Sequence, residues 1–319
     1  MSRVPRIASP RHQNRCNRTQ TAHPCRRRAN DNAWLVSAVR GTRFEIMGEA
    51  QSRWPSAGES VQNSVVEKEV LAARVEAARA EDGNSSWCYH SRASLAHRYV
   101  AMTVPKVACT TIKMALQTWE GCGPPPERWG EVHASWAGPT LLAYPTAQIV
   151  EMLRSPGYLR FSFVRNPYSR LVSAWKSKLA WADPQYRQLR ESIREACDYP
   201  VVDGQRAGPI LFRDAVQCLP GGPGVFDDHW SPQVDLLVAD VIDYHVVGRF
   251  ERFGQQFHAI LRRLHAPPEV AGIARRVFNP TQPMPLAAVY DPQLARRVYD
   301  LYIADFETFG YHKDSWRDE

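Results

Sequence analysis

The spacing of hydrophobic residues changes abruptly within residues 99–119. Tyr99 to Val104 form a short run of aromatic, β-branched and other apolar residues, which predicts a buried strand. Pro105 ends this strand, because proline has no N–H to donate to a neighbouring strand. Apolar residues then recur with the spacing of one helix face, at Ile112, Ala115, Leu116 and Trp119. The segment therefore predicts a strand, a tight turn and an amphipathic helix.

The same order of elements recurs further along the chain. Residues 158–164 have few polar interruptions and predict a central strand, and Asn166 and Pro167 suit the N-cap and first position of a following helix. Residues 244–247 predict a third strand. Strands that alternate with helices predict an α/β fold, a three-layer sandwich around a central, mostly parallel sheet. Ligands of such sheets bind beyond the carboxyl ends of the strands, where both strand-to-helix turns would lie.

The rest of the chain shows weaker patterns. A polar connector is expected at 84–95 and a loop at 121–139, because neither segment has a sustained apolar period. Asp291 as N-cap and Pro292 at the first position predict a long helix that ends by Gly310. Other helical patterns cover residues 62–81, 146–153, 183–197, 209–219 and 251–264.

Composition and charge divide the chain. Of its 319 residues 44% are hydrophobic, enough for a substantial core. Residues 1–40 hold nine arginines and one acidic residue, a net charge of +8, whereas the whole chain has +7. The rest of the chain is therefore nearly neutral, and no nucleic-acid-binding surface is expected on the folded part. We expect a disordered basic tail at 1–60, an ancillary helix and connector at 61–95, and the main domain at 96–312.

The cellular setting is inferred from what the sequence lacks. Seven cysteines without paired CxxC spacing argue against a disulfide framework or a zinc site, so reduced thiols are expected. No apolar run is long enough to cross a membrane, and no signal core follows a basic start. These observations favour a soluble, cytoplasmic protein, with peripheral membrane association if its substrate is lipid-linked.

The turn at residues 105–111 carries a lysine and hydroxyl groups between a strand and a helix start. Lys106, Thr110, Thr111 and the free N–H groups of the helix start would suit a phosphate or sulfate. The alternative is a surface turn whose threonines cap the helix. The turn is not a Walker A loop, because no glycine lies between Pro105 and Gln117.

A second candidate anion site follows the strand at 158–164. Arg165 stands at the end of that strand, and Ser173 lies in the helix that follows. A guanidinium group binds phosphate with two hydrogen bonds, and Arg170 is a further candidate. Alternatively, Arg165 pairs with a carboxylate and Ser173 is an ordinary exposed residue.

Together these two stretches, VPKVACTTIKMAL and FSFVRNPYSRLVSAW, resemble the nucleotide-binding signatures of sulfotransferases that use 3′-phosphoadenosine 5′-phosphosulfate. The similarity is closer to carbohydrate sulfotransferases of the chondroitin, dermatan and HNK-1 type and their bacterial relatives. DDHW with YHVVGRFE (227–251) and LYIADFETFGY (301–311) also match, so the resemblance covers about residues 97–311. It implies a P-loop NTPase-like sulfotransferase fold, a glycan or other hydroxyl acceptor, and no metal.

The resemblance also implies roles for individual residues. The 5′-phosphosulfate would contact Lys106, Val107, Ala108, Cys109, Thr110 and Thr111, and the 3′-phosphate would contact Arg165 and Ser173. Lys106 would neutralise charge on the leaving group, and either His229 or His133 would be the general base. Asp227 and Asp228 would orient the imidazole or contact acceptor hydroxyls. Sugar rings would stack on tryptophans, unless these pack in the core or its rim: Trp129, Trp136, Trp181 and Trp230.

Some features depart from that family. Its Golgi members carry an N-terminal membrane anchor, which this sequence lacks. They also have cysteines where this chain reads SPQVDLLVADVID, and a lysine where it has Arg249. Two other functions are kept open: a P-loop-like nucleotide kinase or phosphotransferase, and a non-catalytic nucleotide-binding protein.

Overall fold

The structure is a computed structural model, which describes residues 65–80, 86–122, 126–133, 138–180, 184–219, 227–276, 278 and 284–318. The basic tail expected at residues 1–60 lies outside the described residues.

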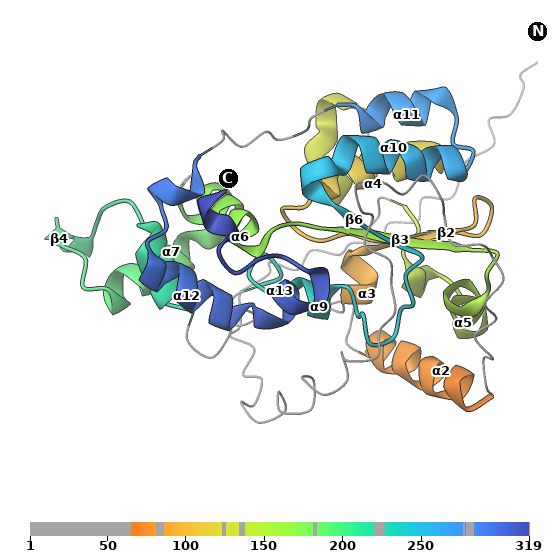
Figure 1. Ribbon diagram of the computed structural model, residues 1–319, viewed down its shortest axis with the longest axis horizontal. Coiled ribbons are helices and arrows are strands. Elements are labelled where there is room, and N and C mark those ends of the chain that lie inside the picture. Colours follow the sequence, from red (N-terminus) through yellow and green to blue (C-terminus); the bar gives the residue numbers. More distant parts are fainter. Residues whose placement is uncertain are drawn as a thin grey trace, which may run out of the picture.

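A four-stranded sheet forms the centre of the molecule, in the order β1-β2-β3-β6 (Figure 1). Its strands are β1 (Ser91–Ser94), β2 (Tyr99–Met102), β3 (Leu159–Val164) and β6 (Val246–Arg249). The strands β2, β3 and β6 are parallel, and β1 pairs antiparallel with β2 at one edge. Every residue of β2 and β3 is buried, as their apolar runs predict. The expected α/β fold with a central, mostly parallel sheet is confirmed.

Helices cover both faces of this sheet. The helices α4, α10 and α11 lie on one face, and α5 with α2 lies on the other, whereas α6 to α9, α12 and α13 gather beyond one end of the strands (Figure 1). The helices are α2 (Val65–Ala80), α3 (Ser86–Tyr89), α4 (Cys109–Trp119), α5 (Thr146–Arg154), α6 (Pro167–Trp175), α7 (Arg187–Ala196), α8 (Phe212–Gln217), α9 (Gln233–Leu236), α10 (Phe253–Arg263), α11 (Pro268–Ala274), α12 (Pro292–Leu301) and α13 (Ile303–Phe309). A short hairpin, β4 (Val201–Val202) with β5 (Gln205–Arg206), lies apart from the sheet.

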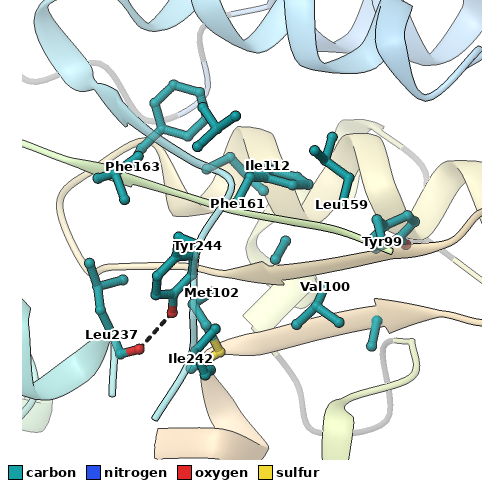
Figure 2. Packing of buried hydrophobic residues seen from close by; sticks show 14 of the residues in the cluster. Tyr99, Val100, Met102, Ile112, Leu159, Phe161, Phe163, Leu237, Ile242 and Tyr244 are labelled. Carbon is teal, nitrogen blue, oxygen red and sulfur yellow. Dashed lines mark hydrogen bonds between the residues drawn. The ribbon is translucent and has the colours of Figure 1, made fainter. Parts of the chain in front are cut away.

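The main core is packed around the middle strand. Phe161 and Phe163 are two residues apart in β3 and therefore point to the same face, where their rings contact Phe257 of α10. On the other face, Met102 of β2 lies beside Tyr244, whose hydroxyl donates to the Leu237 carbonyl (Figure 2). This packing holds the carboxyl ends of β2 and β3 in fixed register.

A second cluster of buried apolar side chains links α6 with α8, α12 and α13. Tyr168 of α6 is fully buried there and packs against Tyr290 and Phe306. The predicted start of α6 is confirmed, because the Asn166 side chain accepts a hydrogen bond from the Tyr168 N–H and Pro167 follows it. The cluster therefore anchors the helix that carries Ser173.

Several expectations about the elements are wrong. The connector at 84–95 contains α3 and the edge strand β1, whose polar residues are buried. The Ser91 hydroxyl accepts a hydrogen bond from the Leu141 N–H. Part of the loop expected at 121–139 is a 3₁₀ helix, Pro126–His133. The long helix from Asp291 breaks at Tyr302, whose hydroxyl donates to the Trp230 carbonyl. Helices α9 and α11 were not expected.

Candidate functional site

The turn after β2 has an unusual backbone conformation. Lys106 and Ala108 both have left-handed backbone angles, with φ values of 68° and 51°. Such angles cost a non-glycine residue about 1–2 kcal/mol and are retained where the surrounding structure requires them. Ala108 caps α4, and its carbonyl accepts the first helical hydrogen bond, from the Ile112 N–H. The N–H groups just before Ile112 therefore have no carbonyl partner within the helix and form an anion-binding terminus.

The Lys106 ammonium group lies within a cluster of positive charge. Its Nζ donates to the Ser177 hydroxyl at 2.9 Å. Burial lowers the pKa of Lys106 to about 8. Cys109 opposes this shift, and the nearby cations Lys178, Arg165 and Arg170 add to it. An anion bound here would relieve this repulsion, so the site is electrostatically suited to a phosphate or sulfate.

Arg165 connects the second predicted stretch to the first. Its Nη1 donates to the Lys106 carbonyl at 3.2 Å, and its Nε donates to the Ser169 hydroxyl at 3.0 Å. Ser169, Ser173 and Ser177 follow one another at four-residue intervals, so Ser173 lies on the same side of α6 as Ser169, one turn away. The structure therefore brings Lys106, Arg165 and a row of serine hydroxyls together.

Arg170 has a structural role in this arrangement. Its side chain is buried and donates to three backbone carbonyls, those of Pro105, Ser231 and Asp228. These bonds connect the turn after β2 to the segment that contains His229. Arg170 thus donates hydrogen bonds to the protein backbone, whereas the sequence made it a further candidate for binding phosphate.

His229 is held in one orientation by a carboxylate and a phenol. Its Nδ1 lies 3.1 Å from Asp227 Oδ1, and the Tyr186 hydroxyl donates to the other oxygen of the same carboxylate. Burial lowers the pKa of His229 below its ordinary value, although Asp227 partly opposes this effect. Burial alone would raise the pKa of Asp227, but hydrogen bonds from His229 and Tyr186 outweigh it and leave that pKa lowered. The imidazole is therefore neutral near pH 7, with Nδ1 facing Asp227.

His133 occupies a different environment in the same region. Its Nε2 lies 3.0 Å from the Thr110 hydroxyl at the start of α4. Burial lowers the pKa of His133 to about 3, and the positive charges of Lys113, Arg92 and His229 contribute. The contribution of His229 indicates that the two imidazoles are near enough to interact electrostatically.

Comparison with known proteins shows the family of this chain. A model of the sulfotransferase family matches residues 90–312, more than half of the chain. The chain belongs to the sulfotransferase family. The matched segment spans both candidate anion-binding stretches and both candidate histidines. No solved structure matches the chain.

Characterised sulfotransferases are similar to this chain over about two thirds of its length. Carbohydrate sulfotransferase 14 from Danio rerio is 28% identical over 222 residues, 67% of this chain and 60% of that protein. Carbohydrate sulfotransferase 10 from Xenopus laevis is 28% identical and carbohydrate sulfotransferase 8 from Mus musculus is 27% identical, covering 69% and 68% of this chain. The chain spans 66% and 55% of the length of these two relatives.

The expectation of a cytoplasmic location is wrong. The relatives are carbohydrate sulfotransferases, which are Golgi-lumenal enzymes. Among the described residues, none of the helices combines the length and apolar character needed to cross a membrane. Within the same residues there is no group of three His, Cys, Asp or Glu side chains positioned to hold a metal ion.

Four polar residues in or around the candidate site were missed from the sequence. Ser177 and Tyr186 contact Lys106 and Asp227. The buried His90 lies 2.7 Å from Asp228, and the buried Lys113 donates to the Tyr89 carbonyl. His90 fell in the segment taken for a connector, and Lys113 was hidden in an apolar helix pattern. Lys113 has a sequence signal, since it is a charged residue within an apolar helix pattern, whereas the other three stand among polar residues that give no such signal.

The tryptophans considered for sugar stacking have different outcomes. Trp230 is only 1% exposed and packs in the second cluster, which is the core-packing alternative expected for it rather than sugar stacking. Trp136, Trp181 and the side chain of Trp129 lie outside the described part of the chain.

Proposed function

We propose that this sulfotransferase moves the sulfuryl group of 3′-phosphoadenosine 5′-phosphosulfate to a hydroxyl of a carbohydrate, by in-line transfer with a histidine base. The contact between Arg165 and the Lys106 carbonyl carries the proposal, because it joins the two anion-binding stretches beside His229. The names of the relatives support a carbohydrate acceptor. The strand–turn–helix around Lys106 supports a P-loop NTPase-like fold in which the glycines of a Walker loop are absent.

The donor is a substrate with two anionic ends, and the residues present suit both. Its 5′ end would lie on the N-terminus of α4, against the backbone of residues 107–109 and the hydroxyls of Thr110 and Thr111. Its 3′-phosphate would accept hydrogen bonds from Arg165 and Ser173. The Ser173 hydroxyl is free to donate, since none of the described residues hydrogen-bonds it. The assignment requires no further cation, because lysine, arginine and helix N–H groups supply the positive potential.

His229 is better placed than His133 to be the base. Its Nδ1 is held by Asp227, which leaves Nε2 as the acceptor for a proton. In contrast, Nε2 of His133 is already engaged by Thr110. The acceptor oxygen would form a bond to sulfur as the bond from sulfur to the bridging oxygen breaks. The hydroxyl proton would move to His229 Nε2, and Lys106 would stabilise the charge on the departing phosphate.

The test combines binding with transfer of labelled sulfate. Adenosine 3′,5′-bisphosphate should bind without metal, whereas ATP with Mg²⁺ should bind far more weakly; the reverse order would favour the nucleotide kinase. A panel of p-nitrophenyl glycosides and desulfated glycosaminoglycans should identify the acceptor. Lys106→Ala should lower the turnover at least ~100-fold, whereas Lys68→Ala, at an exposed position of α2, should not. Near-normal turnover by Lys106→Ala would disprove the assignment of Lys106.

A further inference from the structure

A buried histidine outside the proposed mechanism holds a carboxylate at the edge of the site. The His90 side chain is 1% exposed, and its Nε2 lies 2.7 Å from Asp228 Oδ2. The Asp228 side chain is 44% exposed and directly precedes His229 in the chain. One end of this pair is therefore buried in the protein while the other faces solvent beside the candidate base.

His90 is itself fixed in position. Its carbonyl accepts hydrogen bonds from both the N–H and the hydroxyl of Thr103, at 2.8 and 2.9 Å. Burial lowers the pKa of His90 more than the neighbouring Asp228 raises it, so the imidazole is neutral at pH 7 and donates through Nε2–H. The Asp228 carbonyl is held separately by Arg170 Nη2 at 3.1 Å. Both the backbone and one carboxylate oxygen of Asp228 are thus immobilised.

The second oxygen of this carboxylate is available for a ligand. Among the described residues, His90 is the side chain that hydrogen-bonds Asp228, and it contacts Oδ2. An ionised carboxylate only accepts hydrogen bonds, so Oδ1 suits a hydroxyl or N–H donor and disfavours an anion. The donor nucleotide is anionic at both ends, whereas a sugar presents several hydroxyl donors on adjacent carbons.

We propose that Asp228, positioned by His90, binds a second hydroxyl of the acceptor, adjacent to the hydroxyl that is sulfated. This inference rests on the proposed function, and it makes Asp228 a determinant of acceptor specificity. An acceptor without the adjacent hydroxyl would leave the carboxylate unpaired in the complex. Losing one hydrogen bond to a charged group corresponds to about a 10- to 100-fold lower kcat/KM.

The experiment compares a glycoside with its deoxy analogues. The best p-nitrophenyl glycoside of the panel and its monodeoxy derivatives are assayed with labelled donor. The wild-type enzyme should discriminate against one deoxy analogue by ~10-fold or more, and Asp228→Ala should reduce that ratio to near one. The KM for the donor should stay unchanged in this variant. Asp240→Ala, a carboxylate paired with Arg74 away from the site, should keep the wild-type ratio.

The role of His90 is tested by replacing its hydrogen-bond donor. His90→Gln keeps an N–H group near the position of Nε2 and should retain most of the selectivity, whereas His90→Leu should lose it with the donor KM preserved. Equal selectivity in His90→Leu and wild type would overturn the positioning role. Unchanged discrimination by Asp228→Ala would overturn the whole inference while leaving the proposed function intact. If the wild-type enzyme sulfates no glycoside, both the proposed function and this inference fail.

Discussion

Binding of an anion beside Lys106 should take up protons from solution. In the structure without ligand, burial and neighbouring cations hold the pKa of Lys106 at about 8, against an ordinary value of 10.5. That difference corresponds to about 3 kcal/mol of disfavoured charge, at about 1.4 kcal/mol per pKa unit. A phosphate at hydrogen-bond distance contributes attraction of about 4 kcal/mol at an effective dielectric constant near 20. The two energies are comparable, so the bound anion should restore most of the ordinary pKa.

The size of the uptake follows from this shift. At pH 8 about half of the free enzyme carries an uncharged Lys106, so binding of adenosine 3′,5′-bisphosphate should take up ~0.5 proton per molecule. At pH 7 the lysine is mostly charged already, and the uptake should fall to ~0.1 proton. The affinity for adenosine 3′,5′-bisphosphate should decrease as the pH rises above 8. Lys106 is then mostly uncharged in the free enzyme, and the free energy needed to protonate it is subtracted from the free energy of binding.

Isothermal titration calorimetry in buffers with different ionisation enthalpies measures the uptake directly. Lys113 is the matched control, since burial also lowers its pKa to about 8, but its Nζ donates to the Tyr89 carbonyl and lies over the Tyr89 ring. Lys106→Ala should abolish the uptake at pH 8, and Lys113→Met should preserve it. Uptake that persists in Lys106→Ala, or disappears in Lys113→Met, would refute the reasoning.

Two further predictions concern catalysis and packing. Burial lowers the pKa of His229 and the base must be neutral, so kcat should fall only below pH 6.5. His229→Ala should remove this acidic limb of the pH profile. A limb near pH 3 would instead indicate His133, whose pKa is about 3. Gly248→Ala should destabilise the protein by about 1–3 kcal/mol in urea unfolding, because the new Cβ would lie 2.3 Å from the Phe163 ring. Gly254→Ala, in a helix with open space around its Cβ, should be neutral or stabilising, and equal losses in the two variants would contradict this packing argument.

Local signals in the sequence were enough for the elements that hold the candidate site. The apolar runs predicted β2 and β3, because strands buried on both faces need apolar residues at nearly every position. Asn166 and Asp291 were predicted as helix caps, and each side chain accepts the expected backbone hydrogen bond. These features depend on neighbours within a few residues, so their physical cause is present in the sequence itself.

The tertiary structure decided which polar residues meet. His90 and Asp228 are 138 residues apart and form a pair only because β1 joins the edge of the sheet. The polar sequence of β1 is stabilised by partners from elsewhere in the chain, and no periodicity reveals such partners. The helical pattern from Asp291 is likewise interrupted at Tyr302, whose hydroxyl donates to the distant Trp230 carbonyl.

The sequence by itself determined the α/β framework and predicted two candidate anion-binding stretches at strand ends. Only the tertiary structure brought Arg165 to the Lys106 carbonyl, placed Arg170 on backbone carbonyls and buried Trp230. The physical reason is the range of the interactions. Periodicity and capping act over one or two turns of chain, whereas the charge around Lys106 and the orientation of His229 depend on residues from separate elements.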